Sequence, residues 1–215
     1  MYQHYTKENF IIGKSNIKAW EVCEAALSNS KAQQNPTILY GMTGSGKTHL
    51  AHIAISQAND AVQLSAMDFI DGLVTALSNQ AEDEFRHRLI NYDVLAIDDL
   101  QHFVGRNVCQ DEICLILDAR LAQGKQTVIT SIEHPKSLTW NNKQLESRLI
   151  SGLTIKLELA DEDMQKQLLA KRLKKANVAV TSEEIVNAVK STNGNGWLIE
   201  GVAKQMVDNY GYKNA

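Results

Sequence analysis

The stretch Gly41-Met42-Thr43-Gly44-Ser45-Gly46-Lys47-Thr48 lies between a short apolar run, residues 37–40, and a segment of helical character that begins near Lys47. It fits the phosphate-binding loop pattern G-x-x-x-x-G-K-[ST] in the strand-to-helix setting that the pattern requires. Glycines let the backbone curl until successive N–H groups point at a phosphate, and the following helix N-terminus adds a favourable dipole. The stretch therefore predicts a nucleotide site in which Lys47 reaches the β- and γ-phosphates and Thr48 binds Mg²⁺. The alternative is a glycine-rich turn with an incidental lysine.

Further short β-rich runs follow this loop and alternate with longer amphipathic stretches. They are residues 61–64, 94–97, 127–130 and 154–157. This alternation predicts an α/β fold, in which a parallel sheet is sandwiched by helices. The run Val94-Leu95-Ala96-Ile97 carries no charge, which is typical of a central strand that is buried on both faces.

The pattern changes after Leu159, where the β-rich runs stop and helical spacing takes over. One helix is expected from Asp161, and a second from Thr181, whose hydroxyl can form a capping box with Glu184. A third is expected from about Trp197 to Tyr210. We therefore expect two units: an α/β nucleotide-binding domain over residues 1–159 and a small all-helical lid subdomain over residues 160–215, here called the helical lid.

Two adjacent acids, Asp98-Asp99, directly follow the charge-free run. A buried strand that delivers carboxylates to the mouth of a parallel sheet is the Walker B arrangement. Asp98 is expected to hold Mg²⁺, while Asp99 can accept a hydrogen bond from the attacking water and orient it. The alternative is that the two acids only cap the segment that follows.

Composition limits the classes of function. The chain has 215 residues, is 44% hydrophobic, and carries 22 Lys and Arg against 25 Asp and Glu, a net charge of −3. This balance disfavours a dedicated binder of duplex DNA or anionic membranes, so any contact with nucleic acid should be local. The absence of a long apolar run and of a signal peptide predicts a cytoplasmic protein with no membrane partner.

Beyond the loop, the sequence resembles the AAA+ ATPase domain of the bacterial replication initiator DnaA. The matching pieces include Gly13-Lys14-Ser15-Asn16, Lys47-Thr48-His49-Leu50, Ile97-Asp98-Asp99-Leu100-Gln101, Thr130-Ser131, Leu145-Glu146-Ser147-Arg148-Leu149 and Leu198-Ile199-Glu200-Gly201. They occur in the family's order and cover roughly residues 5 to 205. The resemblance implies a P-loop sheet with a helical lid, binding of ATP or ADP with Mg²⁺, and a role in DNA replication.

The resemblance also assigns roles to particular residues. It places adenine contacts at Ile11, Ile12 and Asn16. It places the other nucleotide contacts at Thr43, Gly44, Ser45, Gly46, Lys47, Thr48 and His49. Thr130 matches the position that senses the γ-phosphate, and Arg148 matches the arginine finger that reaches the nucleotide of a neighbouring subunit. The alternative for Arg148 is an ordinary surface arginine.

Two positions depart from the family pattern. Trp197 stands where the family has the lid arginine known as sensor 2, and Trp cannot ligate a phosphate. Ile132 follows Thr130-Ser131 where the family has an aspartate. Both differences predict slow intrinsic hydrolysis, or a helical lid whose position is weakly coupled to the nucleotide.

The chain is similar in domain content to the Hda-type regulatory relatives, although residues 1–10 lack their sliding-clamp motif. We therefore expect a regulator of replication initiation that assembles with DnaA or with itself, without a duplex-DNA-binding domain. The alternatives are a non-hydrolysing adaptor of the helicase-loader type and, less favoured by the motifs, a small-molecule kinase. Residues 82–88 match the initiator-specific insertion that can touch single-stranded DNA; a solvated helix face explains them equally well.

Overall fold

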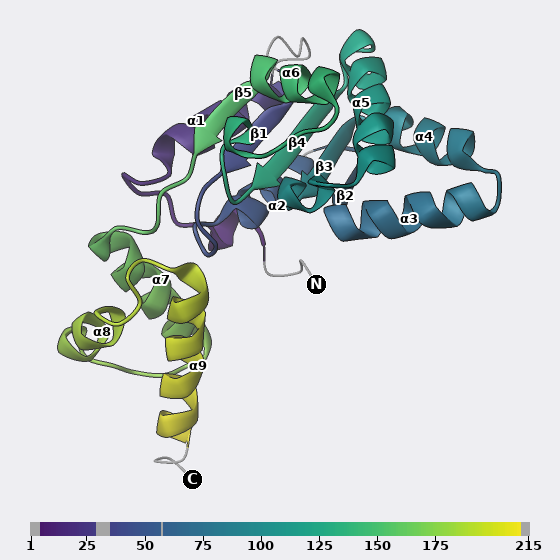
Figure 1. Cartoon of the computed structure of the whole chain (residues 1–215). Helices are drawn as coiled ribbons and strands as arrows, with labels where there is room; N and C mark the ends of the chain where they lie inside the picture. The colour runs from purple at the N-terminus through teal and green to yellow at the C-terminus, as the bar shows by residue number, and fades with distance from the viewer. Residues whose placement is uncertain (1–4, 29–34, 57, 212–215) are drawn as a thin grey trace.

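The computed structural model describes residues 5–28, 35–56 and 58–211, which form a five-stranded parallel sheet with helices on both faces (Figure 1). The strands are β1 (Thr37–Tyr40), β2 (Ala61–Ser65), β3 (Val94–Asp98), β4 (Gln126–Ser131) and β5 (Leu153–Lys156). Their spatial order is β2-β3-β4-β1-β5, and all neighbours pair in parallel. Every strand lies within one residue of its predicted run. The predicted α/β fold is thus confirmed.

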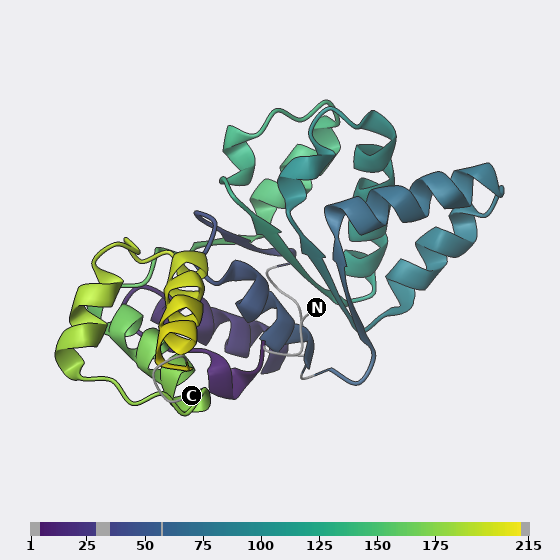
Figure 2. The same cartoon turned by 90° about the horizontal axis from the view of Figure 1, so that it is seen from below.

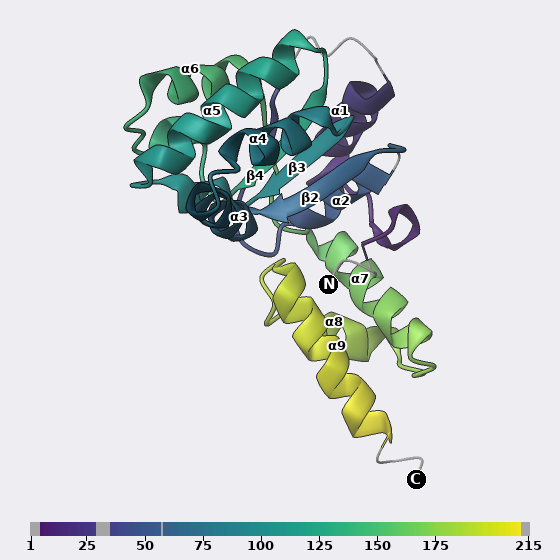
Figure 3. The same ribbon diagram turned by 90° about the vertical axis from the view of Figure 1, so that its right-hand side faces the viewer.

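Helices cover the two faces of the sheet in separate layers, as Figures 2 and 3 show. One layer contains α1 (Ile17–Ser28) and α2 (Lys47–Ser56); the other contains α3 (Ala66–Ser78), α4 (Glu82–Asn91), α5 (Asn107–Ala122) and α6 (Lys143–Ser151). Alternation along β1 builds both cores, because Ile38 joins the cluster around Phe69 of α3 and Leu39 joins the cluster around Leu50 of α2. All five residues of β3 are buried, as predicted for a central strand.

The carboxyl ends of β1, β3 and β4 lie side by side at one edge of the sheet. Tyr40 is in register with Ser131, and Ile97 is in register with Ile129. Short 3-10 helices follow two of these strands, η2 (Leu100–Phe103) after β3 and η3 (Pro135–Ser137) after β4, and η1 (Lys7–Asn9) precedes α1. Ligands of open α/β sheets bind at this edge, so it is where the predicted site residues should meet.

Helices α3 and α4 form a hairpin at one end of the sheet (Figure 1). Helix α3, which was not predicted from the sequence, begins with a capping box between Ser65 and Asp68. In α4, Arg86 makes a bidentate ion pair with Glu112 of α5, with both N···O distances 2.7 Å. The buried Glu112 carboxylate therefore holds Arg86, the first cation of residues 82–88, against α5.

The helical lid consists of α7 (Glu162–Lys175), α8 (Ser182–Val189) and α9 (Gly196–Gly211) and packs around a core of its own. Its fully or nearly buried residues are Leu169, Leu173, Val189, Ile199 and Ala203. The predicted capping box between Thr181 and Glu184 opens α8. Figures 1 and 3 show the lid beside the edge of the sheet at which the strands end. In the described part of the chain, none of the helices combines the length and the apolar character that a bilayer crossing needs.

Candidate nucleotide site

The phosphate-binding loop joins β1 to α2 and is closed by its own lysine. The Lys47 ammonium is buried and donates to the carbonyl oxygens of Gly41 (2.8 Å) and Met42 (2.9 Å). Burial lowers the pKa of Lys47, and the charges of Asp99 and Asp98 act in the opposite direction. The ammonium therefore lies in a partly desolvated position at the centre of the loop, where an anion would meet an incompletely compensated positive charge.

Ser45 provides a second indication that the loop is built for an anion. Its hydroxyl is buried, yet it has no hydrogen-bond partner among the described residues. Buried hydroxyls are nearly always paired, so an unpaired one needs an explanation such as a ligand. A phosphate oxygen is an acceptor that would satisfy it. The loop's donors thus fit the phosphates of a nucleotide.

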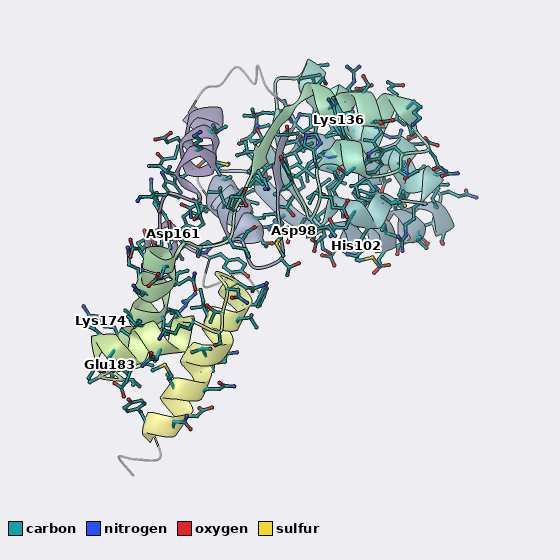
Figure 4. All side chains as sticks on the ribbon, turned by 60° about the vertical axis from the view of Figure 1, so that its left-hand side comes forward. Asp98, His102, Lys136, Asp161, Lys174 and Glu183 are labelled. Atoms are coloured by element: carbon teal, nitrogen blue, oxygen red, sulfur yellow. The ribbon has the colours of Figure 1, made fainter. Side chains whose placement is uncertain are left out.

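Thr48, Asp98 and Thr130 bring three side chains from different elements into one cluster. The Thr48 hydroxyl lies 3.0 and 2.9 Å from the two carboxylate oxygens of Asp98, and the Thr130 hydroxyl donates to the same carboxylate. Asp98 is only 7% exposed, and desolvation raises its pKa in spite of these hydrogen bonds. Figure 4 shows Asp98 at the edge of the α/β body that faces the helical lid. Hydroxyl and carboxylate oxygens in this arrangement are the hard ligands that Mg²⁺ prefers.

Asp99 adopts the left-handed conformation (φ 67°, ψ 54°), which is uncommon for a residue other than glycine. Its N–H donates to the Thr130 hydroxyl (3.0 Å), and its carboxylate accepts from the Gln101 amide (2.9 Å). The Gln101 oxygen in turn accepts the N–H of Ile132 (3.2 Å). Gln101 thus links the second acid to the residue that departs from the family pattern. The sequence contained this glutamine in the Ile97–Gln101 piece, without indicating its role.

Asn16 and His49 shape the N-terminal segment that the resemblance places against adenine. The buried Asn16 side chain donates to the Ile11 carbonyl and accepts the Gly13 N–H, both at 2.9 Å. The His49 Nε2 lies 2.9 Å from the Thr6 carbonyl oxygen, which can only accept, so Nε2–H is the donor; burial lowers the pKa of His49 to about 4. Both side chains are therefore engaged in holding this segment. Direct adenine contact stays a prediction for Asn16, Ile11 and the 44%-exposed Ile12, and nucleotide contact stays a prediction for His49.

Arg148 does not join the other predicted site residues. It lies on α6, which leads into the start of β5 and thus toward the edge of the sheet opposite the phosphate-binding loop. Its guanidinium forms an ion pair with Asp118 of α5, and the Gln144 amide donates to the same carboxylate at 2.7 Å. An arginine in this place could act on a nucleotide only in another subunit.

A parallel sheet with a phosphate-binding loop after β1, an acid pair after β3 and a helical lid beside the strand ends defines a P-loop protein of AAA+ architecture. The sequence profile of the bacterial DnaA ATPase domain matches residues 1–156, and the chain belongs to that family.

Individual relatives agree with this assignment. The chain is 33% identical over 208 residues to the chromosomal replication initiator protein DnaA of Bordetella pertussis, covering 94% of this chain and 44% of that protein. Domain III of Thermotoga maritima DnaA has a TM-score of 0.88 and 28% identity, with 98% of this chain and 91% of that chain covered. A replication initiator DnaA bound to AMPPCP and single-stranded DNA has a TM-score of 0.87 and 32% identity, with 95% and 65% covered. The chain spans less than half the length of the Bordetella protein.

Proposed function

We propose that this chain binds ATP and ADP with Mg²⁺ between the phosphate-binding loop and Asp98. The observation that carries the proposal is the convergence of the Thr48 and Thr130 hydroxyls on the buried Asp98 carboxylate, next to a loop that holds Lys47 and the unpaired Ser45 hydroxyl. A DnaA structure bound to AMPPCP lends support. Thr48 and Asp98 would hold Mg²⁺, which neutralises phosphate charge when bound.

Titration with a fluorescent ATP analogue and with ADP tests nucleotide binding. Lys47→Ala should lower the affinity for ATP and for ADP at least tenfold, because it removes the charge at the centre of the loop. Lys143→Ala is the matched control: its ammonium lies on α6, 78% exposed, paired with Glu146. Unchanged affinity in Lys47→Ala would remove the phosphate-site assignment.

We further propose that bound ATP is hydrolysed slowly. Asp99 would orient the attacking water, while Thr130 reaches both acids and lies where the resemblance places the γ-phosphate. Trp197 and Ile132 offer no charged group to the transferred phosphoryl, which favours a low rate. Phosphate release should fall at least tenfold in Asp99→Asn. Equal and negligible rates in wild type and variant would favour the second candidate, a nucleotide-bound adaptor.

The biological role that we propose is regulation of replication initiation through nucleotide-dependent assembly with DnaA or with a second copy. It rests on family membership and on Arg148, whose place on α6 suits action in another subunit. A pull-down of DnaA with and without ATP tests the partner. Arg148→Ala should lower partner-dependent ATPase while Lys143→Ala, on the same helix, leaves it unchanged. If wild type neither binds DnaA nor changes its ATPase rate, and stays monomeric with ATP, this role is refuted.

A local contact with single-stranded DNA through α4 belongs to the same proposal. A related DnaA structure contains such DNA. Because Arg86 is bound to Glu112, the cation that we assign to this contact is Arg88, whose guanidinium lies 5.6 Å from the Phe85 ring. Fluorescence anisotropy with a labelled oligothymidine should therefore report weaker binding for Arg88→Ala. Identical anisotropy curves for the two proteins would argue against this surface.

We also propose that the α/β body and the helical lid divide at residues 159 and 160. Strand β5 ends at Lys156 and α7 begins at Glu162, while Leu157 still belongs to a core of the body. Limited proteolysis should cut first between these two elements. Cleavage within α7 instead would move the boundary.

A further inference from the structure

The turn that precedes α9 touches the phosphate-binding loop across 152 residues of sequence. The Asn195 amide Nδ2 donates to the Thr43 carbonyl (3.0 Å), and the Gly196 N–H donates to the Gly44 carbonyl (2.9 Å). The other end of the same amide, Oδ1, accepts the N–H of Trp197 (2.9 Å) and so caps α9. One side chain thus joins the first turn of a lid helix to the loop proposed to hold phosphate.

The approach of the two segments is close enough to require glycine on both sides. Gly44 has φ +84°, and a Cβ built there would lie 2.2 Å from Asn195 Oδ1. A Cβ on Gly196 would lie 2.8 Å from the Gly44 carbonyl oxygen. The contact is therefore specified by residues on both segments, since a larger side chain at either glycine would push them apart.

The direction of these hydrogen bonds determines how the loop's peptides are turned. In a trans peptide the C=O and N–H groups point in opposite directions. The Thr43 carbonyl faces Asn195, so the Gly44 N–H faces away from the lid turn. The Gly44 carbonyl faces Gly196, and the Ser45 N–H donates to the Met42 carbonyl (3.2 Å), which also receives Lys47 Nζ. The lid turn thus holds the Thr43–Gly44 peptide with its N–H directed away from the lid, whereas the Ser45 N–H is engaged by the Met42 carbonyl inside the loop.

We propose that Asn195 is a positioning residue for phosphate binding. Its amide fixes the Thr43–Gly44 peptide from outside and, together with the Gly196 N–H, preorients the loop's donors before a nucleotide arrives. The proposal rests on the proposed nucleotide binding and assigns the lid a specific part in it. Because the fixed donors serve phosphates that ATP and ADP share, the lid supports both nucleotides equally. A phosphate-binding arginine at position 197 would instead favour ATP.

The test is the variant Asn195→Ser, which keeps a side-chain oxygen to cap α9 but is too short to reach the Thr43 carbonyl. Affinities for ATP, ADP and inorganic pyrophosphate are measured, the last as a competitor of a fluorescent ADP analogue. We expect all three to weaken by about fivefold, the effect of losing one orienting hydrogen bond. The matched control is Asn187→Ser on α8, whose amide oxygen accepts from the exposed Lys190 ammonium at 2.9 Å.

A second variant addresses the same contact without touching Asn195. Gly196→Ala should move the lid turn away from the Gly44 carbonyl and lower the affinities for ATP, ADP and pyrophosphate by a similar factor. The circular dichroism spectrum should stay unchanged. Unchanged affinities in both variants, or a loss confined to ATP, would overturn the positioning role. An unchanged pyrophosphate affinity beside a reduced ADP affinity would also do so, since it would place the effect at the base. If wild type binds none of the three, the proposed function fails instead.

Discussion

Replacement of Arg120 by Met should destabilise the protein by about 4 kcal/mol. Arg120 is completely buried and donates to the backbone carbonyls of Leu89, Ile90, Tyr92, Asp93 and Gln126, at 2.6 to 3.3 Å. Its Nε also donates to the Thr127 hydroxyl, which can rotate to another partner. These carbonyls belong to the end of α4, the turn into β3 and the start of β4, so a single guanidinium joins three elements.

The magnitude follows from the acceptors that would lose this donor. Ile90 keeps the Lys125 ammonium at 3.1 Å, whereas the other four carbonyls lose the guanidinium. A buried acceptor left without a donor costs about 1 kcal/mol at the lower end of the usual range, which gives about 4 kcal/mol in total. The lower end applies because Met also relieves the burial of a cation, a burial that lowers the pKa of Arg120 to about 10.

Urea unfolding followed by circular dichroism measures the loss, and hydrogen exchange should show that amides of α4 lose protection first. The control is Arg106→Met, because Arg106 is exposed and its guanidinium donates to the His102 carbonyl on the surface; we expect a loss of less than about 0.5 kcal/mol there. A loss below about 1 kcal/mol in Arg120→Met would refute the idea that this guanidinium satisfies otherwise unpaired carbonyls.

Three further predictions concern the site. Because the folded-state pKa of His49 is about 4, below its unfolded value, stability should be complete above about pH 6.5 and fall by roughly 3 kcal/mol toward pH 4; urea titrations of His49→Gln should show a flatter curve. Trp197→Arg should raise the ratio of ATP to ADP affinity about tenfold in equilibrium binding, and an unchanged ratio would place residue 197 away from the γ-phosphate. Asp118→Asn removes the ion pair that holds Arg148, so the partner-dependent ATPase rate should rise while the free energy of unfolding changes by less than about 0.5 kcal/mol. A lower ATPase rate would mean that Asp118 orients the guanidinium.

Features that local sequence determines were predicted correctly. The strand runs, the capping box at Thr181 and the central position of β3 each depend on neighbouring residues or on a simple burial pattern. The cluster of Thr48, Asp98 and Thr130 was also expected, because parallel strands bring their carboxyl ends to one edge.

Features that depend on packing between distant segments were not predictable. Nothing around Asn195 indicates a contact with Thr43, since that contact requires the helical lid to lie beside the strand ends. Helix α3 is an exception, because its local sequence does carry a signal: the residues that it buries, Phe69, Ile70, Leu73 and Ala76, recur at helical spacing. For His49, the motif suggested a nucleotide contact, whereas the ring is engaged by Thr6 of a segment that is distant in sequence.

The placement of cations explains why this site would depend on a partner. Trp197 lies in the first turn of α9, the lid helix nearest the phosphate-binding loop, and is 62% exposed. The lid meets the loop through hydrogen bonds to backbone carbonyls and offers no charge at this position. In the proposal above, those bonds would serve phosphates common to ATP and ADP. Under the proposed function, recognition of the γ-phosphate would fall to Lys47, to Thr130 and to a guanidinium from another subunit. Arg148 can supply one, because its ion pair with Asp118 is partly exposed and such pairs stabilise little. If the proposed function holds, discrimination between ATP and ADP would therefore be stronger in the assembly than in the isolated chain.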